Sequence, residues 1–336
     1  MINTRQIIAL NEISGCGASI IRKIVSESQK QTQATFSDSE LMEFVNDCIS
    51  SGLKRCRLKT VNKSVFFDAI SYADRLIEKS DKYGIKMLSY VDEKFPRQLL
   101  DTINEEGKAD VPLLLYYKGD LSITKKQGVA IIGTREPTKE GVFAGEYFGE
   151  RLASADYNIV SGLAIGCDTA GHRGALKSPE GKTTAFLAHG LDTVYPRENE
   201  KLAAEIVERG GLLMSEYPIG NNVNRYFLVA RDRLQAALSA ATIVIQTGIQ
   251  GGTNHAANTT LISNKPLFCV KYNDPLLMSH EKVAGNNALV AKGAKFITSS
   301  DFMDVIKQSL GTHEVIDSLI NGKQDNEQKD LLLFND

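Results

Sequence analysis

The sequence lacks the features that mark secreted, metal-binding and membrane-spanning proteins. Its five cysteines are odd in number and scattered, without a CxxC pair or a His/Cys cluster, which argues against a disulfide framework and a zinc site. The chain does not open on a basic stretch followed by an apolar one, and it has no run of about 18 apolar residues that would span a bilayer. We therefore expect a soluble cytoplasmic protein without a metal or a membrane partner.

The sequence also lacks an excess of charge of either sign. With 39 Lys and Arg against 41 Asp and Glu, the formal net charge is -2. Proteins that coat nucleic acid indiscriminately usually present a broad basic surface, so this balance argues against that class. Basic residues gather only locally, between Lys54 and Lys63 and in a group of Arg225, Arg231 and Arg233. Such groups are commonly solvated surface, and their position relative to a binding site decides their role.

A chain of 336 residues favours two domains with apolar cores. Apolar residues near the N-terminus have helical spacing, broken at Gly15-Cys-Gly17, which predicts a small helical domain of the helix-hairpin-helix or SAM-like type. The predicted segments are a helical domain at 1–84, a connecting unit and linker at 85–127, a main domain at 128–310 and a short tail at 311–336. Within the connecting unit, residues 113–117 are a predicted strand.

The main domain alternates short apolar, β-branched runs with amphipathic stretches. Strands are expected near residues 129–132, 158–161, 184–188, 212–214, 242–246, 267–270 and 295–297. This alternation predicts an α/β fold with a Rossmann-like, mostly parallel sheet.

The most informative stretch is residues 128–141, where an apolar run stops at Gly133, Thr134 and Arg135. Glycine lets a backbone N–H approach a ligand, threonine offers a hydroxyl, and arginine offers a planar set of donors. A helix expected to start near Thr138 directs its positive end at the same place. These residues predict a phosphate site at the end of a strand.

Two further strand ends repeat this pattern, in residues 158–172 and 246–254. The small or hydroxyl-bearing residues expected to face the ligand are Ser161, Gly162, Gly166, Gly251, Gly252 and Thr253, with Asp168 as a helix cap. Because open parallel sheets bind ligands at the carboxyl ends of their strands, we expect one phosphate-lined pocket.

Several motifs follow one another in a familiar order. They are Gly133-Thr-Arg135, Ser161-Gly-Leu-Ala-Ile-Gly-Cys-Asp168, Gly190-Leu-Asp-Thr-Val-Tyr-Pro-Arg-Glu-Asn199, Ser215-Glu-Tyr-Pro-Ile-Gly220, Arg231-Asp-Arg233, Gly251-Gly-Thr253 and Gly285-Asn-Asn287. Together they resemble the DNA-processing protein A family (DprA, also called Smf). The resemblance spans about residues 128–298 and extends weakly back to the glycine turn near Gly15.

This resemblance implies a cytoplasmic homodimer that binds and protects single-stranded DNA and helps load the RecA recombinase onto it in natural transformation (competence) or DNA recombination. It implies no enzymatic step and no cofactor. The DNA or phosphate contacts would be Gly133, Thr134, Arg135, Ser161, Gly162, Gly166, Asp168, Arg231, Arg233, Gly251, Gly252, Thr253 and Asn287. A possible second DNA contact would be Lys54, Arg55, Arg57 and Lys59. Base preference is expected to be weak, since phosphate contacts carry no base information.

The chain also departs from the family pattern. Asp232 replaces the asparagine that the family usually carries between two arginines, and we expect it to pair with one of them and weaken anion binding. Residues 311–336 are too few for the C-terminal winged helix of many members, so we expect a divergent member without it. Its setting stays open between transformation, general recombination and a defence or mobile-element role.

Two other classes of function stay open. One is a nucleotide-binding sensor or an enzyme that processes nucleoside monophosphates, as the architecturally similar cytokinin-activating phosphoribohydrolases do, although Gln250-Gly-Gly-Thr-Asn-His-Ala256 lacks their glutamate. The other is a regulator that docks on a partner through the helical domain or through Leu331-Leu-Leu-Phe334.

Several reactive residues have ordinary structural explanations that compete with catalysis. His172 is expected to be a structural donor, and Cys167 a small buried residue. Asp192 and Glu216 are favoured as loop-supporting carboxylates rather than as an acid/base pair. Tyr195 is left open between stacking on a base and packing its own loop.

Overall fold

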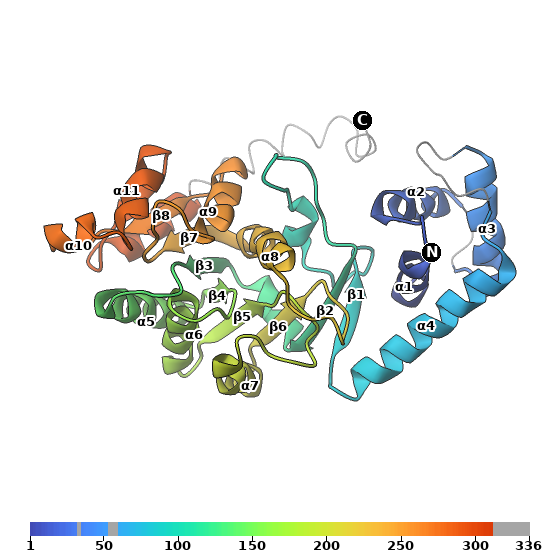
Figure 1. The fold of residues 1–336 in the computed structure, drawn as a ribbon, viewed down its shortest axis with the longest axis horizontal. Coiled ribbons are helices and arrows are strands. Elements are labelled where there is room, and N and C mark those ends of the chain that lie inside the picture. Colours follow the sequence, from blue (N-terminus) through green and yellow to red (C-terminus); the bar gives the residue numbers. More distant parts are fainter. Residues whose placement is uncertain (32–34, 53–59, 312–336) are drawn as a thin grey trace.

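A nine-stranded sheet lies at the centre of the computed structural model, which describes residues 1–31, 35–52 and 60–311 (Figure 1). Its strands are β1 (Lys86–Ser89), β2 (Leu114–Gly119), β3 (Gly128–Ile132), β4 (Asn158–Ser161), β5 (Lys182–Phe186), β6 (Leu212–Ser215), β7 (Ser239–Val244), β8 (Leu267–Val270) and β9 (Lys295–Ile297). The order is β1-β2-β6-β5-β4-β3-β7-β8-β9. β2 is antiparallel to β1 and to β6, while β3 to β9 are parallel to one another. The predicted α/β class with a mostly parallel sheet is confirmed.

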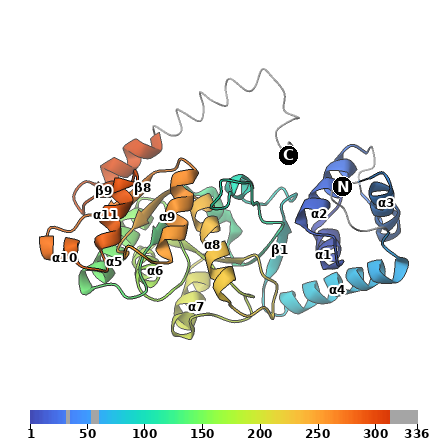
Figure 2. The same cartoon turned by 45° about the horizontal axis from the view of Figure 1, so that its top comes forward.

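Helices cover both faces of the sheet, which is why its central strands are buried, apolar and rich in β-branched residues. The helices are α5 (Lys139–Ser154), α6 (Cys167–Lys177) and α7 (Glu200–Glu208) on one face and α8 (Arg225–Leu238), α9 (Thr253–Ile262) and α11 (Ala284–Ala291) on the other, with the short α10 (Pro275–Ser279) beside them (Figures 1 and 2). None of the helices in the described residues is both long enough and apolar enough to cross a membrane.

The strand order creates a crevice at the end of β3. This strand pairs with β4 on one side and with β7 on the other. The chain leaves β3 for α5 on one face of the sheet and leaves β7 for α9 on the opposite face (Figure 1). Neighbouring loops that diverge in this way leave a gap between them at the carboxyl edge of the sheet, where such folds bind ligands.

The described residues of the N-terminal part form four helices, which pack against the antiparallel edge of the sheet (Figure 2). They are α1 (Thr4–Glu12), α2 (Ala18–Gln29), α3 (Asp38–Ser50) and α4 (Lys63–Asp81). Their apolar faces share a buried cluster with Ile85, Leu114 and Tyr116, so the helices cover β1 and β2. The expected helical composition is confirmed, and the turn between α1 and α2 contains the predicted glycine, Gly15, with φ of 86°.

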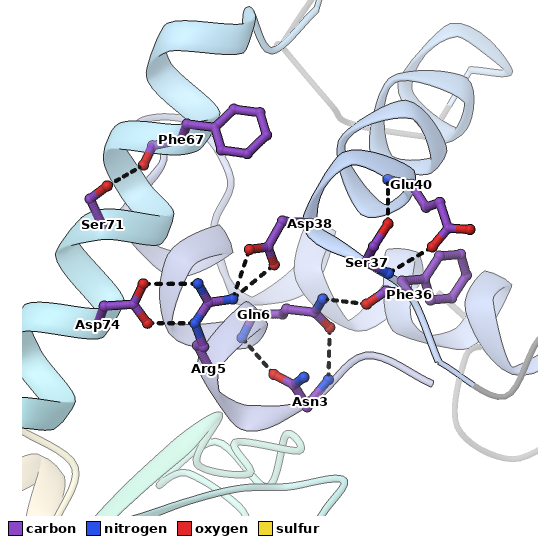
Figure 3. Close-up of polar contacts among 10 residues, drawn as sticks. All are labelled: Asn3, Arg5, Gln6, Phe36, Ser37, Asp38, Glu40, Phe67, Ser71 and Asp74. Atoms are coloured by element: carbon purple, nitrogen blue, oxygen red, sulfur yellow. Dashed lines mark hydrogen bonds and ion pairs between the residues drawn. The ribbon is translucent and has the colours of Figure 1, made fainter.

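One arginine connects three of these helices (Figure 3). Arg5 on α1 forms two hydrogen bonds with Asp74 of α4, at 2.5 and 2.8 Å, and two with Asp38 of α3, at 2.8 and 2.9 Å. The hydrogen bonds from Arg5 lower the pKa of Asp74. Beside it, the buried Gln6 side chain donates to the carbonyl of Phe36. Polar contacts thus fix the angles at which the short helices meet.

Some predicted boundaries were wrong. The strand expected at 184–188 lies at 182–186, and the strand expected at 242–246 lies at 239–244. In both places the strand stops before the run of buried residues ends, because the chain turns out of the sheet while it is still covered by helices. The structure also adds β1, which lengthens the sheet from within the connecting unit, where only the strand at 113–117 was expected.

Helices α5 and α6 approach each other so closely that some positions admit only glycine. A Cβ atom on Gly174 would lie 2.1 Å from the carbonyl oxygen of Glu146, and one on Gly149 would lie 2.4 Å from that of Gly171. Backbone atoms cannot yield to such contacts without a shift of a whole helix.

We expect Gly174→Ala to lower the free energy of unfolding by about 1–3 kcal/mol, because the added methyl group forces the two helices apart. The matched control is Gly252→Ala, where a Cβ atom would meet nothing within 4 Å and φ is -59°, so the change should stay within about 1 kcal/mol. Urea denaturation followed by circular dichroism measures both. Equal stability of the two variants would contradict the packing argument.

Candidate functional site

The crevice at the ends of β3 and β7 is a cleft of about 1310 Å³. Typical small-molecule sites measure about 300–1,000 Å³, so this cleft has room for an extended ligand. The loop after β3 lines one side with Gly133, Thr134 and Arg135. The loop after β7 and the start of α9 line another side from Thr247 to Ala256, and one face of α8 lines a third.

Hydrogen bonds between the loops hold the cleft in shape. Thr134 N donates to Gln246 O at 2.7 Å, and Cys167 N donates to Thr134 O at 3.1 Å. The side chain of Gln246 also accepts from Thr138 N and donates to Thr138 Oγ1, at 2.9 and 3.0 Å. Thr138 is the N-cap of α5, as predicted. The loops after β3, β4 and β7 are therefore joined directly to one another.

A buried asparagine supports the loop after β7 from behind. Asn286 accepts from Thr247 N at 3.0 Å and donates to the carbonyls of Ile245 and Val270 at 3.0 and 3.1 Å. Its neighbour Asn287, which was the predicted contact, is exposed and donates to Met278 O. Asn286, which had no predicted role, therefore holds the loop after β7 in place, whereas Asn287 does not.

Cations lie at the rim of the cleft. Arg135 and Arg225 are exposed and line it from two different elements, the loop after β3 and the start of α8. In the described part of the chain neither guanidinium has an ion-pair partner within 4.0 Å. Lys282 also lines the cleft and lies 3.8 Å from the exposed carboxylate of Glu136. Unpaired, solvent-facing guanidinium groups are well suited to bind anions.

Arg231 lies deeper, with only 6 % of its side chain exposed. Its Nη1 donates to Phe186 O at 3.0 Å, and its Nε lies 3.2 Å from Asp232 Oδ1. A Cβ atom on Gly162 would lie 1.4 Å from Arg231 Nη1, so the absence of a side chain at Gly162 makes the room for this guanidinium. On the far side, Asp168 accepts hydrogen bonds from the backbone N–H groups of Gly162 and Ala164.

The expectation that Asp168 caps α6 was wrong. The N-cap of that helix is Gly166, with φ of 87° and no side-chain cap. Asp168 lies inside the first turn, and its carboxylate turns back to the preceding loop, whose N–H groups at Gly162 and Ala164 have no strand partner. The N–H of Gly162 is thus bonded within the protein.

Asp232 places a second carboxylate in the cleft. Its side chain is 16 % exposed and lines the cleft, and Gln235 Nε2 donates to its Oδ1 at 2.9 Å. Burial raises the pKa of Asp232 to about 6, against the opposing effect of Arg231. The expected pairing of this residue with one of its neighbouring arginines is present in the structure.

Arg233 points away from the cleft. It forms two hydrogen bonds with Glu216, at 2.7 and 2.8 Å, and an ion pair of 2.6 Å with Asp110. Two carboxylates therefore neutralise this guanidinium, and removing it would leave Glu216 partly buried without its partner.

Residues 86–308 match the profile of the family described as DNA recombination-mediator protein A. The chain belongs to this family.

Curated relatives of the family agree in sequence over most of this chain. It is 30% identical over 238 residues to the DNA processing protein DprA of Streptococcus pneumoniae, a match that covers 71% of this chain and 80% of that protein. It is 29% identical over 242 residues to the protein Smf of Escherichia coli, and here the match covers 72% of this chain. The chain spans only 61% of that Smf protein and 58% of the Smf protein of Synechocystis.

Two solved structures of the family share the fold. The X-ray structure of DprA from Streptococcus pneumoniae superposes with a TM-score of 0.70 at 26% identity and covers 90% of this chain and 98% of that one. A structure that concerns the single-stranded DNA binding mode of DNA processing protein A from Helicobacter pylori superposes with a TM-score of 0.56 at 29% identity, covering 67% and 96%.

The cleft gathers most, but not all, of the residues assigned from the family resemblance. Those that line it are Gly133, Thr134, Arg135, Asp168, Arg231, Gly251, Gly252 and Thr253. Those outside its lining are Ser161, Gly162, Gly166, Arg233 and Asn287. The hydroxyl of Ser161 donates to Ile131 O at 2.6 Å. The possible second contact at Lys54, Arg55, Arg57 and Lys59 lies outside the described residues, as does the tail from 312 to 336.

Other residues of this family member line the cleft without having been assigned to it. They are Glu136, Tyr195, Arg225, Asp232, Gln235, His255 and Lys282. On α8 the signal was helical spacing, since Leu228, Asp232 and Gln235 recur at intervals of three and four. Tyr195 is 44% exposed at the rim.

The residues with competing structural explanations are bonded within the protein. His172 is fully buried, its Nδ1 lies 2.6 Å from Thr183 Oγ1, and burial lowers its pKa to about 3. Burial raises the pKa of Cys167 to about 12. Asp192 accepts from the N–H of Gly220. Among the described residues, no group of three or more His, Cys, Asp or Glu side chains is arranged to hold a metal ion.

The raised pKa of Asp232 should make the stability of the folded protein depend on pH. Its pKa in the folded protein, about 6, exceeds the ordinary value of 3.8, so the folded state binds this proton more tightly than the unfolded state does. The contribution of Asp232 to folding is therefore most favourable below pH 4 and is lost as the pH rises through 6. Asp232→Asn should be more stable than the wild type at pH 7.5, by on the order of 2 kcal/mol, with little difference at pH 4.

Urea denaturation of both proteins at the two pH values measures this difference. Comparing the variant with the wild type at each pH cancels the titration of all other groups. A difference that is the same at both pH values would contradict the raised pKa.

Proposed function

We propose that this chain is a recombination mediator of the DprA type that binds and protects single-stranded DNA. The observation that carries the proposal is Arg135 at the end of β3, which is exposed and has no ion-pair partner among the described residues, in a cleft larger than a small-molecule site. Arg225, at the start of α8, also lines the cleft and would bind a second phosphate of the same strand. The family membership and the DNA binding mode studied in the Helicobacter pylori protein support the same ligand.

The cleft also explains why a single strand would be preferred to a duplex. Its rim carries the exposed cations, whereas in its interior the buried Arg231 is paired with the partly buried Asp232. Phosphates on the rim leave the bases of a flexible strand free to turn inward, while duplex bases are paired and stacked with one another.

Arg135→Ala should weaken binding of a single-stranded oligonucleotide by about tenfold or more, since a charge-assisted contact contributes about 1.5–3 kcal/mol. The slope of log affinity against log salt should fall by about 0.7, the value for one phosphate contact on a single strand. Fluorescence anisotropy of a labelled strand and of its duplex across a salt series measures both.

The matched control for this experiment is Arg151→Ala. Arg151 is exposed on α5 and does not line the cleft, so its loss removes the same charge at a distance. If Arg135→Ala and Arg151→Ala bind equally well, the assigned site is wrong. If the wild type binds no oligonucleotide at low salt, the proposed function is wrong.

We further infer from family membership that the protein acts in the cytoplasm as a homodimer and helps load RecA onto the bound strand, in natural transformation or in another recombination process. In this function it works by binding, without an enzymatic step or a cofactor. Formation of RecA filaments on single-stranded DNA, with and without this protein, tests the loading step. Sedimentation of the purified protein tests the dimer.

A second candidate function is the processing of nucleoside monophosphates. The observation in its favour is Asp232, whose raised pKa of about 6 suits a general acid or base at neutral pH. Incubation with nucleoside monophosphates and chromatography of the products tests this activity. Release of a free base that stops in Asp232→Asn would replace the mediator proposal with a hydrolase.

A further inference from the structure

The carboxylate of Asp232 lies in the interior of the cleft, where its negative charge disfavours a phosphate. Asp232 Oδ1 is held by Gln235 Nε2 at 2.9 Å and by the proximity of Arg231 Nε at 3.2 Å. This carboxylate therefore has a fixed position in the cleft wall. A negative charge there repels a phosphate, so the interior next to Asp232 suits a group that donates hydrogen bonds.

A second acceptor lies beside this carboxylate. Gln235 lines the cleft with 2 % of its surface exposed, and its Oε1 has no hydrogen-bond partner in the described residues. Its nitrogen is already bonded to Asp232. Buried polar atoms are rarely left unpaired, so this oxygen is suited to accept a hydrogen bond from a donor group of a ligand.

The rim cations are thus set apart from the acceptors of the interior, where the buried Arg231 already lies beside Asp232 and donates to Phe186 O. The cations Arg135, Arg225 and Lys282 lie at the rim, and the acceptors of Asp232 and Gln235 lie along the inner face of α8. A nucleotide has the same division, because its phosphate is anionic and the edge of its base carries N–H groups.

The four DNA bases differ in how well they match a fixed carboxylate. Guanine presents two adjacent donors, N1–H and N2–H2, which can reach both oxygens of one carboxylate. Thymine presents a single N–H between two carbonyl oxygens, which the carboxylate repels. Adenine and cytosine each present one amino group beside a ring-nitrogen acceptor.

We propose that Asp232 binds the Watson–Crick edge of a guanine base turned into the cleft, with Gln235 as the residue that positions its carboxylate. The proposal rests on the proposed binding of single-stranded DNA and adds a base preference to it. It departs from the weak preference expected from phosphate contacts alone, because Asp232 contacts a base and not the backbone.

The test compares short thymidine oligonucleotides that differ in one central base. Anisotropy should show that guanine at this position binds about tenfold more tightly than thymine, the effect of one two-bond contact to a base. Inosine, which keeps N1–H but lacks the amino group, should fall between them. Equal affinity for guanine, inosine and thymine would overturn the proposal and leave the binding of single-stranded DNA intact.

The matched variants are Asp232→Asn and Glu136→Gln. Asparagine has nearly the same shape as aspartate but only one acceptor oxygen, so Asp232→Asn should bring the ratio of guanine to thymine affinity close to one. Glu136 is an acid at the rim with an 81% exposed side chain. Its neutralisation should strengthen binding of every oligonucleotide and leave the ratio unchanged.

A guanine preference that survives in Asp232→Asn would overturn the role given to this residue. A preference that Glu136→Gln removes equally would show that charge alone, and not contact with the base, is responsible, and would also overturn it. Failure of every oligonucleotide to bind at low salt would overturn the proposed function together with this inference.

Discussion

The buried guanidinium of Arg231 sets the arrangement of the cleft. A cation this deep is tolerated only if its charge is compensated by a nearby carboxylate or dipole. Phe186 O at the end of β5 accepts from it, and the carboxylate of Asp232 lies beside it. Gly162 leaves the space that this guanidinium fills. Asp168 secures the adjoining loop, and burial raises its pKa against the opposing effect of the charge on Arg231. One side chain thus connects two strand ends with α8.

Local pattern was enough to predict the parallel core of the fold and not enough to predict its edge. The strands β3 and β8 are fully buried apolar runs, and such runs are recognisable without knowledge of their neighbours. The strand β1 is four residues long and begins with an exposed lysine, so it becomes a strand only because β2 lies beside it. Strand ends were misplaced where buried residues continue into a loop. In such places an apolar pattern predicts burial but does not predict where strand pairing stops.

The candidate site divides in the same way. Glycine-rich strand ends predicted the loops around Gly133 and Gly252, because their composition is a local property. The assignment of both Arg231 and Arg233 to one pocket disregarded helical geometry, since residues two apart on a helix point in nearly opposite directions. Long-range contacts such as those of Gln246 with Thr138 had no local signal, because the residues are 108 positions apart. The exposed Asn287 was predicted to contact the ligand in place of the buried Asn286, because the sequence does not show which of two adjacent side chains points inward.

The glycine contacts between α5 and α6 have a consequence for evolution as well as for folding. Both helices begin directly after cleft loops, and Gly166 at the start of α6 packs against the carbonyl of Thr134, where a Cβ atom would lie 2.5 Å from the oxygen. Substitutions at the distant ends of these helices therefore displace the loops that surround the ligand. Selection for binding therefore also acts on positions that never contact the ligand. Residues of α5 and α6 can be exchanged during evolution only by substitutions that keep the spacing between the two backbones.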